Sequence, residues 1–335
     1  MTDTKKYIQL FDQFSSLKVL IIGDVMIDAY LWGNVDRISP EAPVPIVQVN
    51  HRANRLGGAA NVALNIKALG AEPIMCSVIG NDKQADIFLN LLANENISDT
   101  GIIKSNKRIT TTKFRVIGNN AQMLRVDEEI DEELLIEDQD IFIERIQKII
   151  ENNKIDVIIF QDYDKGVISK SIIEKTKKLV SGKIPIAVDP KRKNFFYYQG
   201  VDLFKPNLKE LQEATNSQFD KKDIKSLQKE VEKLQKQLNV KQIFTTLSEQ
   251  GVFICENING TFTSTLIPAH ARSITDVSGA GDTVISLASL CLALEIDKTV
   301  LAELSNLAGG LVCEELGVIP VNKEKLLKEA IKIYG

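Results

Sequence analysis

The strongest chemical signal in the sequence is Ser278-Gly279-Ala280-Gly281-Asp282, which leads directly into the apolar stretch Val284–Leu294. Its small residues let backbone N–H groups approach a ligand, and a helix start adds unpaired donors and a positive dipole end. These features predict an anion site. Asp282 could take a proton from a hydroxyl group while the amides hold charge that develops on a phosphoryl group. The alternative is an ordinary glycine-rich turn with an aspartate at a helix N-terminus.

Two other phosphate-binding motifs do not fit this sequence. The loop GxxxxGK[ST] occurs nowhere, and GxGxxG would need glycine at position 284, where the chain has valine. The segment is therefore predicted neither as a Walker A loop nor as a dinucleotide-binding turn.

Two further groups of polar residues could bind sugar hydroxyls. Asp24 and Asp28 follow the apolar run Lys18–Gly23, and ligands of open α/β sheets bind beyond the carboxyl ends of strands. In Gly57-Gly58-Ala59-Ala60-Asn61, the glycines permit a tight bend and the asparagine could hydrogen-bond a polyol. The alternatives are a turn aspartate with a surface aspartate, and a plain junction between a loop and a helix.

The segment Asn207-Leu208-Lys209-Glu210 supports two interpretations. Its N-x-x-E spacing closely resembles a helix capping box. In the functional interpretation, Glu210 organises a hydrated Mg²⁺ ion next to ATP phosphates, because Mg²⁺ keeps several waters and needs few carboxylates. The sequence leaves both interpretations open.

Short apolar runs and helical patterns alternate along the chain. The predicted strands are Lys18–Gly23, Pro73–Gly80, Val157–Phe160, Ile184–Val188 and Gln242–Thr246, and the predicted helices include Ala59–Leu69, Gln139–Glu151 and Ser171–Leu179. This alternation predicts an α/β fold with a mostly parallel sheet and helices on both faces. We expect a single domain over residues 1–335.

Residues 29–50 and 108–126 break this pattern, because both contain stretches of alternating polar and apolar residues, such as Ile46-Val47-Gln48-Val49. They predict antiparallel strands outside the main sheet, arranged as a small β-flap over one edge. The exposed apolar face of such a flap would need a partner, so we expect a homodimer.

The bulk composition is that of a globular protein, with 44% hydrophobic and 26% charged residues and a net charge of −4. This charge favours neither nucleic acid nor an anionic membrane as a partner. The N-terminal residues lack an apolar signal-peptide core, and the longest apolar stretch is shorter than the roughly 20 residues that span a bilayer. The four cysteines form no CxxC pair, so we expect a cytoplasmic protein.

Together and in this order, these elements resemble the ribokinase-like (PfkB) carbohydrate kinases from about Lys18 to Gly317. The GAGD segment and the early GG segment are that family's two signatures. The resemblance implies a doubly wound αβα sandwich with a small β-sheet lid, formed by residues 29–50 and 108–126. It implies ATP and Mg²⁺ as cofactors and leaves a monovalent cation requirement open.

The resemblance also implies residue roles. Asp282 would be the catalytic base, and Gly279–Asp282 would form the anion hole. Asn207 and Glu210 would serve the Mg²⁺–ATP side. The segment Thr246–Gly251, which includes Ser248, would be the nucleotide-side loop, and Asn306 would lie on the helix that flanks the adenine.

A narrower resemblance, carried by Arg37–Pro45, Asp162–Gly166 and Asp276–Thr283, is to the D-glycero-β-D-manno-heptose-7-phosphate kinases. It implies phosphorylation of the anomeric hydroxyl to the 1,7-bisphosphate during synthesis of ADP-heptose for lipopolysaccharide. Val277 and Ser248-Glu249 depart from the wider family and look like this branch. The branch often carries a nucleotidyltransferase half with an HxGH motif, which is missing here, so a separate nucleotidyltransferase is expected.

A sugar phosphate substrate would require cations away from the ATP side. Arg115, Arg125 and Lys165 are available, although each could be a solvated surface charge. Two other functions stay open: a kinase for another sugar, such as fructose or ribose, and a catalytically inactive sugar-binding regulator on the same fold.

Overall fold

The computed structural model describes residues 3–218 and 223–335; residues 1–2 and 219–222, which fall within the predicted single domain, lie outside the described residues. A nine-stranded sheet forms the centre of the molecule, with the strand order β13-β12-β11-β10-β9-β8-β1-β4-β5. Neighbouring strands are parallel from β5 to β11, and only β12 and β13 are antiparallel additions at one edge. The predicted α/β fold class is confirmed.

Five strands of the main sheet lie close to the predicted runs: β1 Lys18–Gly23, β4 Glu72–Gly80, β8 Val157–Gln161, β9 Ile186–Asp189 and β11 Gln242–Thr246. The other four were not predicted: β5 Gly101–Ser105, β10 Leu203–Phe204, β12 Val252–Ile258 and β13 Thr261–Ile267. Side chains alternate between the two faces of a strand, so Val19 and Ile21 of β1 enter one apolar cluster and Leu20 and Ile22 enter the other.

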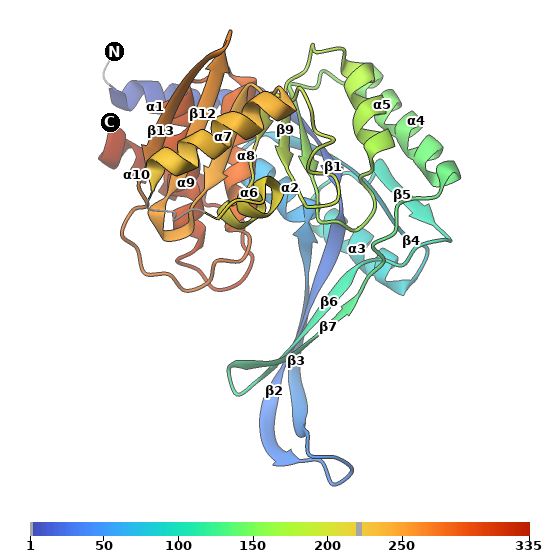
Figure 1. The fold of residues 1–335 in the computed structure, drawn as a ribbon. Coiled ribbons are helices and arrows are strands. Elements are labelled where there is room, and N and C mark those ends of the chain that lie inside the picture. Colours follow the sequence, from blue (N-terminus) through green and yellow to red (C-terminus); the bar gives the residue numbers. More distant parts are fainter. Residues whose placement is uncertain (1–2, 219–222) are drawn as a thin grey trace.

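Helices cover both faces of this sheet (Figure 1). One cluster is packed by α1 Asp3–Gln13, α2 Ala59–Ala68, α3 Lys83–Asn94, α8 Ala280–Ala293, α9 Lys298–Val312 and α10 Lys323–Tyr334. The other is packed by α4 Ile136–Asn152, α5 Lys170–Val180, α6 Leu208–Thr215 and α7 Ile224–Leu238. Within the described ranges, no helix is both long enough and apolar enough to cross a bilayer.

A second sheet of four strands projects from the main body (Figure 1). Its order is β3-β2-β6-β7, with β2 Val25–Ile38, β3 Pro45–Gly58, β6 Thr112–Gly118 and β7 Ala121–Glu128. The pairs β2–β3 and β6–β7 are antiparallel, as predicted, but β2 and β6 are parallel. The reason is that both strands leave the main body in the same direction, each as the first strand of a hairpin. We call this unit the small sheet.

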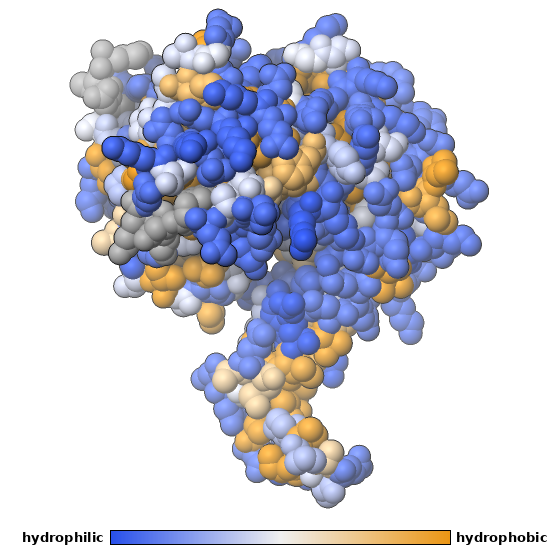
Figure 2. All heavy atoms as spheres, viewed as in Figure 1, coloured by the Kyte–Doolittle hydropathy of each residue, from blue (hydrophilic) through white to orange (hydrophobic). Residues whose placement is uncertain are grey.

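The two faces of the small sheet differ in chemistry. Strand register places Leu31, Phe114, Val116, Leu124 and Val126 on one face, and Leu124 and Val126 are exposed. Orange apolar patches on the projecting part are visible in Figure 2. The opposite face carries charged and aromatic residues from the same strands, namely Asp28, Tyr30, Arg55, Lys113, Arg115 and Arg125.

Candidate active site

Asp282 lies in the first turn of α8, which begins after Gly279 in a left-handed conformation with φ of 79°. Its side chain is buried and accepts three side-chain hydrogen bonds. Asn61 Nδ2 donates over 2.7 Å, the hydroxyl of Tyr163 over 2.7 Å, and Gln161 Nε2 over 3.2 Å. A carboxylate offers about four acceptor positions, so one is left for a further donor such as a substrate hydroxyl.

Burial raises the pKa of Asp282 to about 6, and the hydrogen bonds from Asn61 and Tyr163 work in the opposite direction. A carboxyl group with this pKa is largely ionised at neutral pH, and it is a stronger base than an ordinary aspartate. This combination suits a group that must accept a proton from an alcohol during a reaction.

A buried ion pair lies beside the glycine turn. Lys205 Nζ is 3.0 Å from Asp189 Oδ2, and both side chains are almost completely buried. A Cβ atom added to Gly281 would lie 3.7 Å from Lys205 Nζ and 3.9 Å from Asp189 Oδ2. The missing side chain therefore leaves space in front of a lysine ammonium, next to the unpaired N–H groups of a helix start. These groups fit a phosphate.

Asn61 belongs to α2, which follows directly from β3. The structure places its amide on the carboxylate of Asp282, whereas the sequence suggested a polyol as its partner. The preceding glycines are needed for close approach: a Cβ on Gly57 would lie 2.6 Å from Asp28 Oδ2, and Gly58 has φ of 61°. The predicted junction between a loop and a helix is therefore also part of the site.

Asp24 has partners other than sugar hydroxyls. Its carboxylate is 1% exposed and accepts backbone N–H groups from Tyr163, Lys165 and Val167 at 2.8 to 3.1 Å. It thereby holds the loop that presents Tyr163 to Asp282. The sequence prediction of a substrate ligand gave no indication of this anchoring role.

Asp162 connects the same loop to the segment after β9. It accepts hydrogen bonds from Asn194 Nδ2 at 3.0 Å and the Tyr198 hydroxyl at 2.7 Å. Burial and the neighbouring carboxylate of Asp24 raise the pKa of Asp162 to about 7. The loops after β8 and β9, which both contribute to the site, are thus fastened to each other.

The basic residues predicted to bind a substrate phosphate already have acidic partners. Arg115 pairs with Asp28, while Lys165 Nζ lies 2.7 Å from Glu129 Oε1. Arg125 Nε lies 3.0 Å from Asp127 Oδ1, and its side chain is 53% exposed. Asp28 is the partner of Arg115, so these predicted binding residues are paired with one another or with neighbouring acids.

Asn207 and Glu210 form the capping box of α6. Glu210 N donates to Asn207 Oδ1 over 2.9 Å, and Asn207 N donates to Glu210 Oε2 over 2.8 Å. The other oxygen of Glu210 accepts a hydrogen bond from Lys191 Nζ. The structural interpretation of this motif is therefore confirmed, and it is compatible with a second role for Glu210.

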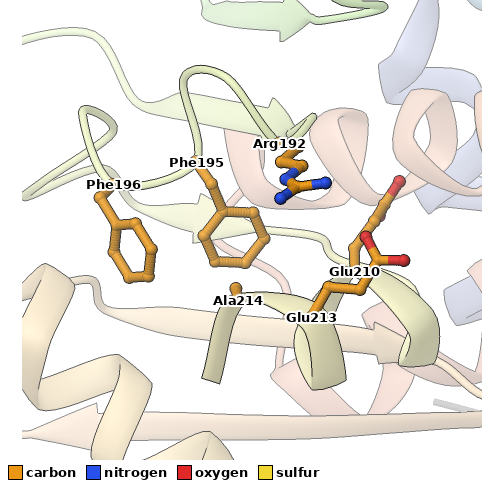
Figure 3. A pocket seen from close by; sticks show the side chains of 6 residues that line it. All are labelled: Arg192, Phe195, Phe196, Glu210, Glu213 and Ala214. Carbon is orange, nitrogen blue, oxygen red and sulfur yellow. The ribbon is translucent and has the colours of Figure 1, made fainter. Parts of the chain in front are cut away.

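A pocket of about 200 Å³ lies between α6 and the segment after β9. Figure 3 shows Phe195, Phe196 and Ala214 on its apolar side, with Arg192, Glu210 and Glu213 around them. Within the described ranges, no three His, Cys, Asp or Glu side chains are grouped as metal ligands. A hydrated Mg²⁺ ion nevertheless fits the position, because Glu210 borders a hollow with room for water and such an ion needs few carboxylates.

The other residues predicted for the nucleotide side lie at the ends of β10 and β11 and on α9. Asn207 and Thr246 form a parallel β-bridge. Ser248 and Gly251 belong to the turn before β12, and Gly251 has φ of 93° with no room for a Cβ beside Ile267 O. Asn306 Nδ2 donates to Pro268 O over 2.9 Å, which fixes the segment after β13.

Several residues of this site were not singled out from the sequence. Gln161 and Asp189 are the last residues of β8 and β9, one position beyond the predicted runs, so the rule that ligands bind beyond the carboxyl ends of strands could have found them. Tyr163 was noticed only as part of a motif. Lys205 follows β10, which has two residues and leaves no recognisable pattern.

The fold and this site together define a class of enzyme in which a glycine-rich helix start lies beside a buried carboxylate. Residues 16–325 match the model of the pfkB family of carbohydrate kinases. The chain belongs to this family.

Two relatives show the degree of similarity within the family. The chain is 39% identical over 317 residues to the bifunctional protein HldE of Desulfatibacillum aliphaticivorans, covering 93% of this chain and 63% of that protein. It is 34% identical over 330 residues to bifunctional protein HldE of Geotalea uraniireducens (strain Rf4), covering 98% and 66%. The chain thus spans slightly less than two thirds of the length of these relatives.

Solved structures confirm the ribokinase-like fold. Phosphofructokinase-2 from Escherichia coli in complex with potassium superposes with a TM-score of 0.75 at 17% identity, covering 94% of this chain and 98% of that one. Ribokinase from Arabidopsis thaliana complexed with ribose and ATP gives a TM-score of 0.69 at 16% identity, covering 93% and 98%. At these identities the likeness concerns the fold alone.

Proposed function

We propose that this chain is an ATP-dependent sugar kinase that phosphorylates D-glycero-β-D-manno-heptose 7-phosphate at its anomeric hydroxyl. One observation supports the kinase step above the others: the buried Asp282, with a pKa of about 6, lies in the first turn of a helix beside Lys205. A carboxylate that can accept a proton thus lies next to N–H groups and an ammonium group that can stabilise negative charge.

In the proposed mechanism, the free acceptor position of Asp282 receives the proton of the sugar hydroxyl. Asn61, Tyr163 and Gln161 hold the carboxylate so that this position faces the substrate. The N–H groups at the start of α8 and the ammonium of Lys205 offset the charge of the phosphoryl group as it leaves ATP. Because these donors are fixed before the substrate arrives, no reorganisation is needed during transfer.

Asn207 and Glu210 would serve the metal side of ATP. The bound Mg²⁺ ion would supply charge neutralisation at the phosphates. For Glu210 to contribute, its contact with Lys191 must loosen, which would make that lysine available to an anionic ligand. Thr246, Ser248, Gly251 and Asn306 lie on the same side and are proposed to border the nucleotide.

The choice of heptose 7-phosphate is supported by two kinds of similarity. The segments Arg37–Pro45, Asp162–Gly166 and Asp276–Thr283 resemble those of the heptose-phosphate kinases. Relatives named bifunctional protein HldE are 34 to 39% identical over most of this chain. We place the reaction in the cytoplasm, before hydrolytic removal of the 7-phosphate and a separate nucleotidyltransferase that would convert the resulting 1-phosphate to ADP-heptose.

The function can be tested with purified protein, ATP, Mg²⁺ and a panel of sugars. ADP release is measured with heptose 7-phosphate, unphosphorylated heptose, fructose 6-phosphate, fructose and ribose, and mass spectrometry identifies the product. We expect the highest kcat/KM with heptose 7-phosphate and a bisphosphate as product. A higher kcat/KM with another sugar would assign that sugar as the substrate instead. ATP binding without turnover on any sugar would indicate a catalytically inactive regulator.

We also propose that the small sheet acts as a lid and as the contact between two copies of the chain. Its apolar face, defined by Leu31, Phe114, Val116, Leu124 and Val126, supports this proposal. Light scattering should give twice the mass of one chain. Leu124→Asp combined with Val126→Asp should yield a monomer, and a native protein that is monomeric at working concentration would contradict the proposal.

A further inference from the structure

Arg55 differs from the other arginines that are not fully exposed. Arg115 and Arg272 pair with carboxylates, and Arg108 and Arg145 hydrogen-bond to backbone carbonyls. Within residues 3–218 and 223–335, Arg55 has neither an ion pair nor such a hydrogen bond. A half-buried guanidinium without a carboxylate keeps its charge and N–H donors available for an anionic ligand.

Tyr30 connects Arg55 to Arg115. The guanidinium carbon of Arg55 lies 5.2 Å from the centre of the Tyr30 ring, and that of Arg115 lies 5.3 Å from it. All three residues are on the charged face of the small sheet. Contact with an aromatic ring fixes the guanidinium while leaving its N–H groups available, which suits the forked binding of phosphate oxygens.

The nearby acids do not neutralise Arg55. Asp28 pairs with Arg115. The carboxylate of Asp276 accepts N–H groups from Ser278 at 2.9 Å and from Gly317 at 3.0 Å. Arg55 itself lies against Gly317, where an added Cβ would be 2.6 Å from its Nη1 atom. The free cation therefore lies where the small sheet meets the segment between α9 and α10, whose Gly317 is hydrogen-bonded to Asp276.

The position of Arg55 relative to Asp282 suits a phosphate at the distant end of a sugar. Arg55 and Asn61 belong to one continuous unit, β3 followed by α2, and Asn61 contacts Asp282. From Arg55 to the strand end at Gly58 is three residues, or about 10 Å at the rise of a β-strand. This separation of backbone positions leaves room for a sugar whose phosphate lies far from the reacting hydroxyl.

The sheet order separates this cluster from the nucleotide side. The small sheet emerges from β1, whereas Asn207 and Thr246 follow β10 and β11 on the other side of β8 and β9. Asp282 contacts Gln161 at the end of β8, between the two. An anion bound by Arg55 would therefore belong to the sugar and not to ATP.

We infer that Arg55, with Arg115 and Tyr30, forms the binding subsite for the phosphate group that the sugar substrate already carries. This inference rests on the proposed function, and it replaces Arg125 and Lys165 as the main cations of that subsite. Arg55 determines specificity: it selects sugars phosphorylated far from the reacting hydroxyl over the same sugars without phosphate.

The experiment compares wild type, Arg55→Gln, Arg55→Lys and Arg52→Gln. Arg52 lies on the same strand, faces the opposite side of the small sheet and is exposed, so it controls for loss of one charge. Because that side is the proposed contact between two copies, light scattering checks that Arg52→Gln keeps the wild-type mass. For each protein, kcat/KM is measured with heptose 7-phosphate and with unphosphorylated heptose. The Kd for heptose 7-phosphate without ATP is measured by calorimetry, and melting temperature checks folding.

We expect Arg55→Gln to lower kcat/KM and affinity for heptose 7-phosphate about 10- to 100-fold, as loss of charge-assisted bonds predicts. Efficiency with unphosphorylated heptose should stay nearly unchanged. The kcat/KM and affinity of Arg55→Lys for heptose 7-phosphate should fall between those of wild type and Arg55→Gln. The values for Arg52→Gln should match wild type.

Two results would overturn the inference alone: an unchanged preference for the phosphorylated sugar in Arg55→Gln, or equal losses with both sugars. A wild-type enzyme that does not prefer the phosphorylated sugar would overturn the substrate assignment as well. The wild-type measurements therefore test the proposed function, and the variant tests the subsite.

Discussion

The surroundings of Asp282 and the charged face of the small sheet represent two ways of building a polar site. Around Asp282, the charged groups have partners before any ligand binds: three side chains hold the carboxylate, and Asp189 holds Lys205. On the small sheet, Arg115 and Arg125 pair with acids, but Arg55 lacks a carboxylate. The first arrangement suits catalytic groups that must stay in place during a reaction. The second leaves a cation available to bind a negatively charged substrate.

The largest effect should follow from Asp282→Asn, which removes the proton acceptor and retains the size of the side chain. Loss of general-base help should lower kcat about 10²- to 10⁴-fold, while ATP affinity stays close to that of wild type. Steady-state kinetics and ATP calorimetry measure the two quantities. Near wild-type turnover would show that the chemistry does not depend on this carboxylate.

Lys205→Met tests whether the buried ion pair also serves the reaction. Removing a fixed cation beside the transferred group should lower kcat on the order of 10²-fold. The variant also leaves Asp189 buried without its partner, which destabilises the fold. The double variant Lys205→Met with Asp189→Asn removes both charges. It should regain melting temperature without regaining rate, whereas recovery of both would mean a purely structural pair.

A smaller effect concerns the pH profile. Asp282 must be ionised to act as a base, so kcat/KM should fall about tenfold per pH unit below its pKa of about 6. The hydrogen bond from Tyr163 lowers this pKa, so Tyr163→Phe should move the inflection to higher pH. The control is Tyr198→Phe, which removes the hydrogen bond to Asp162 instead and should leave the inflection of the pH profile at its wild-type position. Identical profiles for wild type and Tyr163→Phe would exclude this tuning.

The smallest effect is expected at the capping box. Glutamine can replace glutamate in such a box, so Glu210→Gln should keep the melting temperature and raise the Mg²⁺ concentration needed for half-maximal activity. Glu210→Ala should in addition lose about 1 kcal/mol of stability. Glu213→Gln on the same helix controls for charge. An unchanged Mg²⁺ dependence in Glu210→Gln would leave only the capping role.

The parts that sequence could predict are those encoded by local patterns. The runs Lys18–Gly23 and Gln242–Thr246 became strands with these same bounds, because continuous apolar residues bury both faces of a parallel strand. The small residues before Asp282 likewise indicated the helix start. Both features depend on residues that are adjacent in the sequence, so they can be predicted without knowing how the rest of the chain folds.

The pairing of charges could not be predicted in this way. Nothing near Lys165 in sequence indicates that Glu129 neutralises it, or that Arg55 is left without a carboxylate. Arg55 falls between the predicted flap, which ends at residue 50, and the predicted glycine turn at Gly57. Register between β2 and β3 decides which charges meet, and register depends on tertiary packing.

The hydrogen bond between Asn61 and Asp282 joins residues 221 positions apart in the chain. During synthesis at about 5–20 residues per second, α2 would wait roughly 10 to 40 s for this carboxylate to be made. Throughout that time its packing partner α8 is also missing, so the side of α2 that packs against α8 would be accessible on the nascent chain. This contact can thus form only late in synthesis, and a ribosome-bound chain would need protection from aggregation until it does.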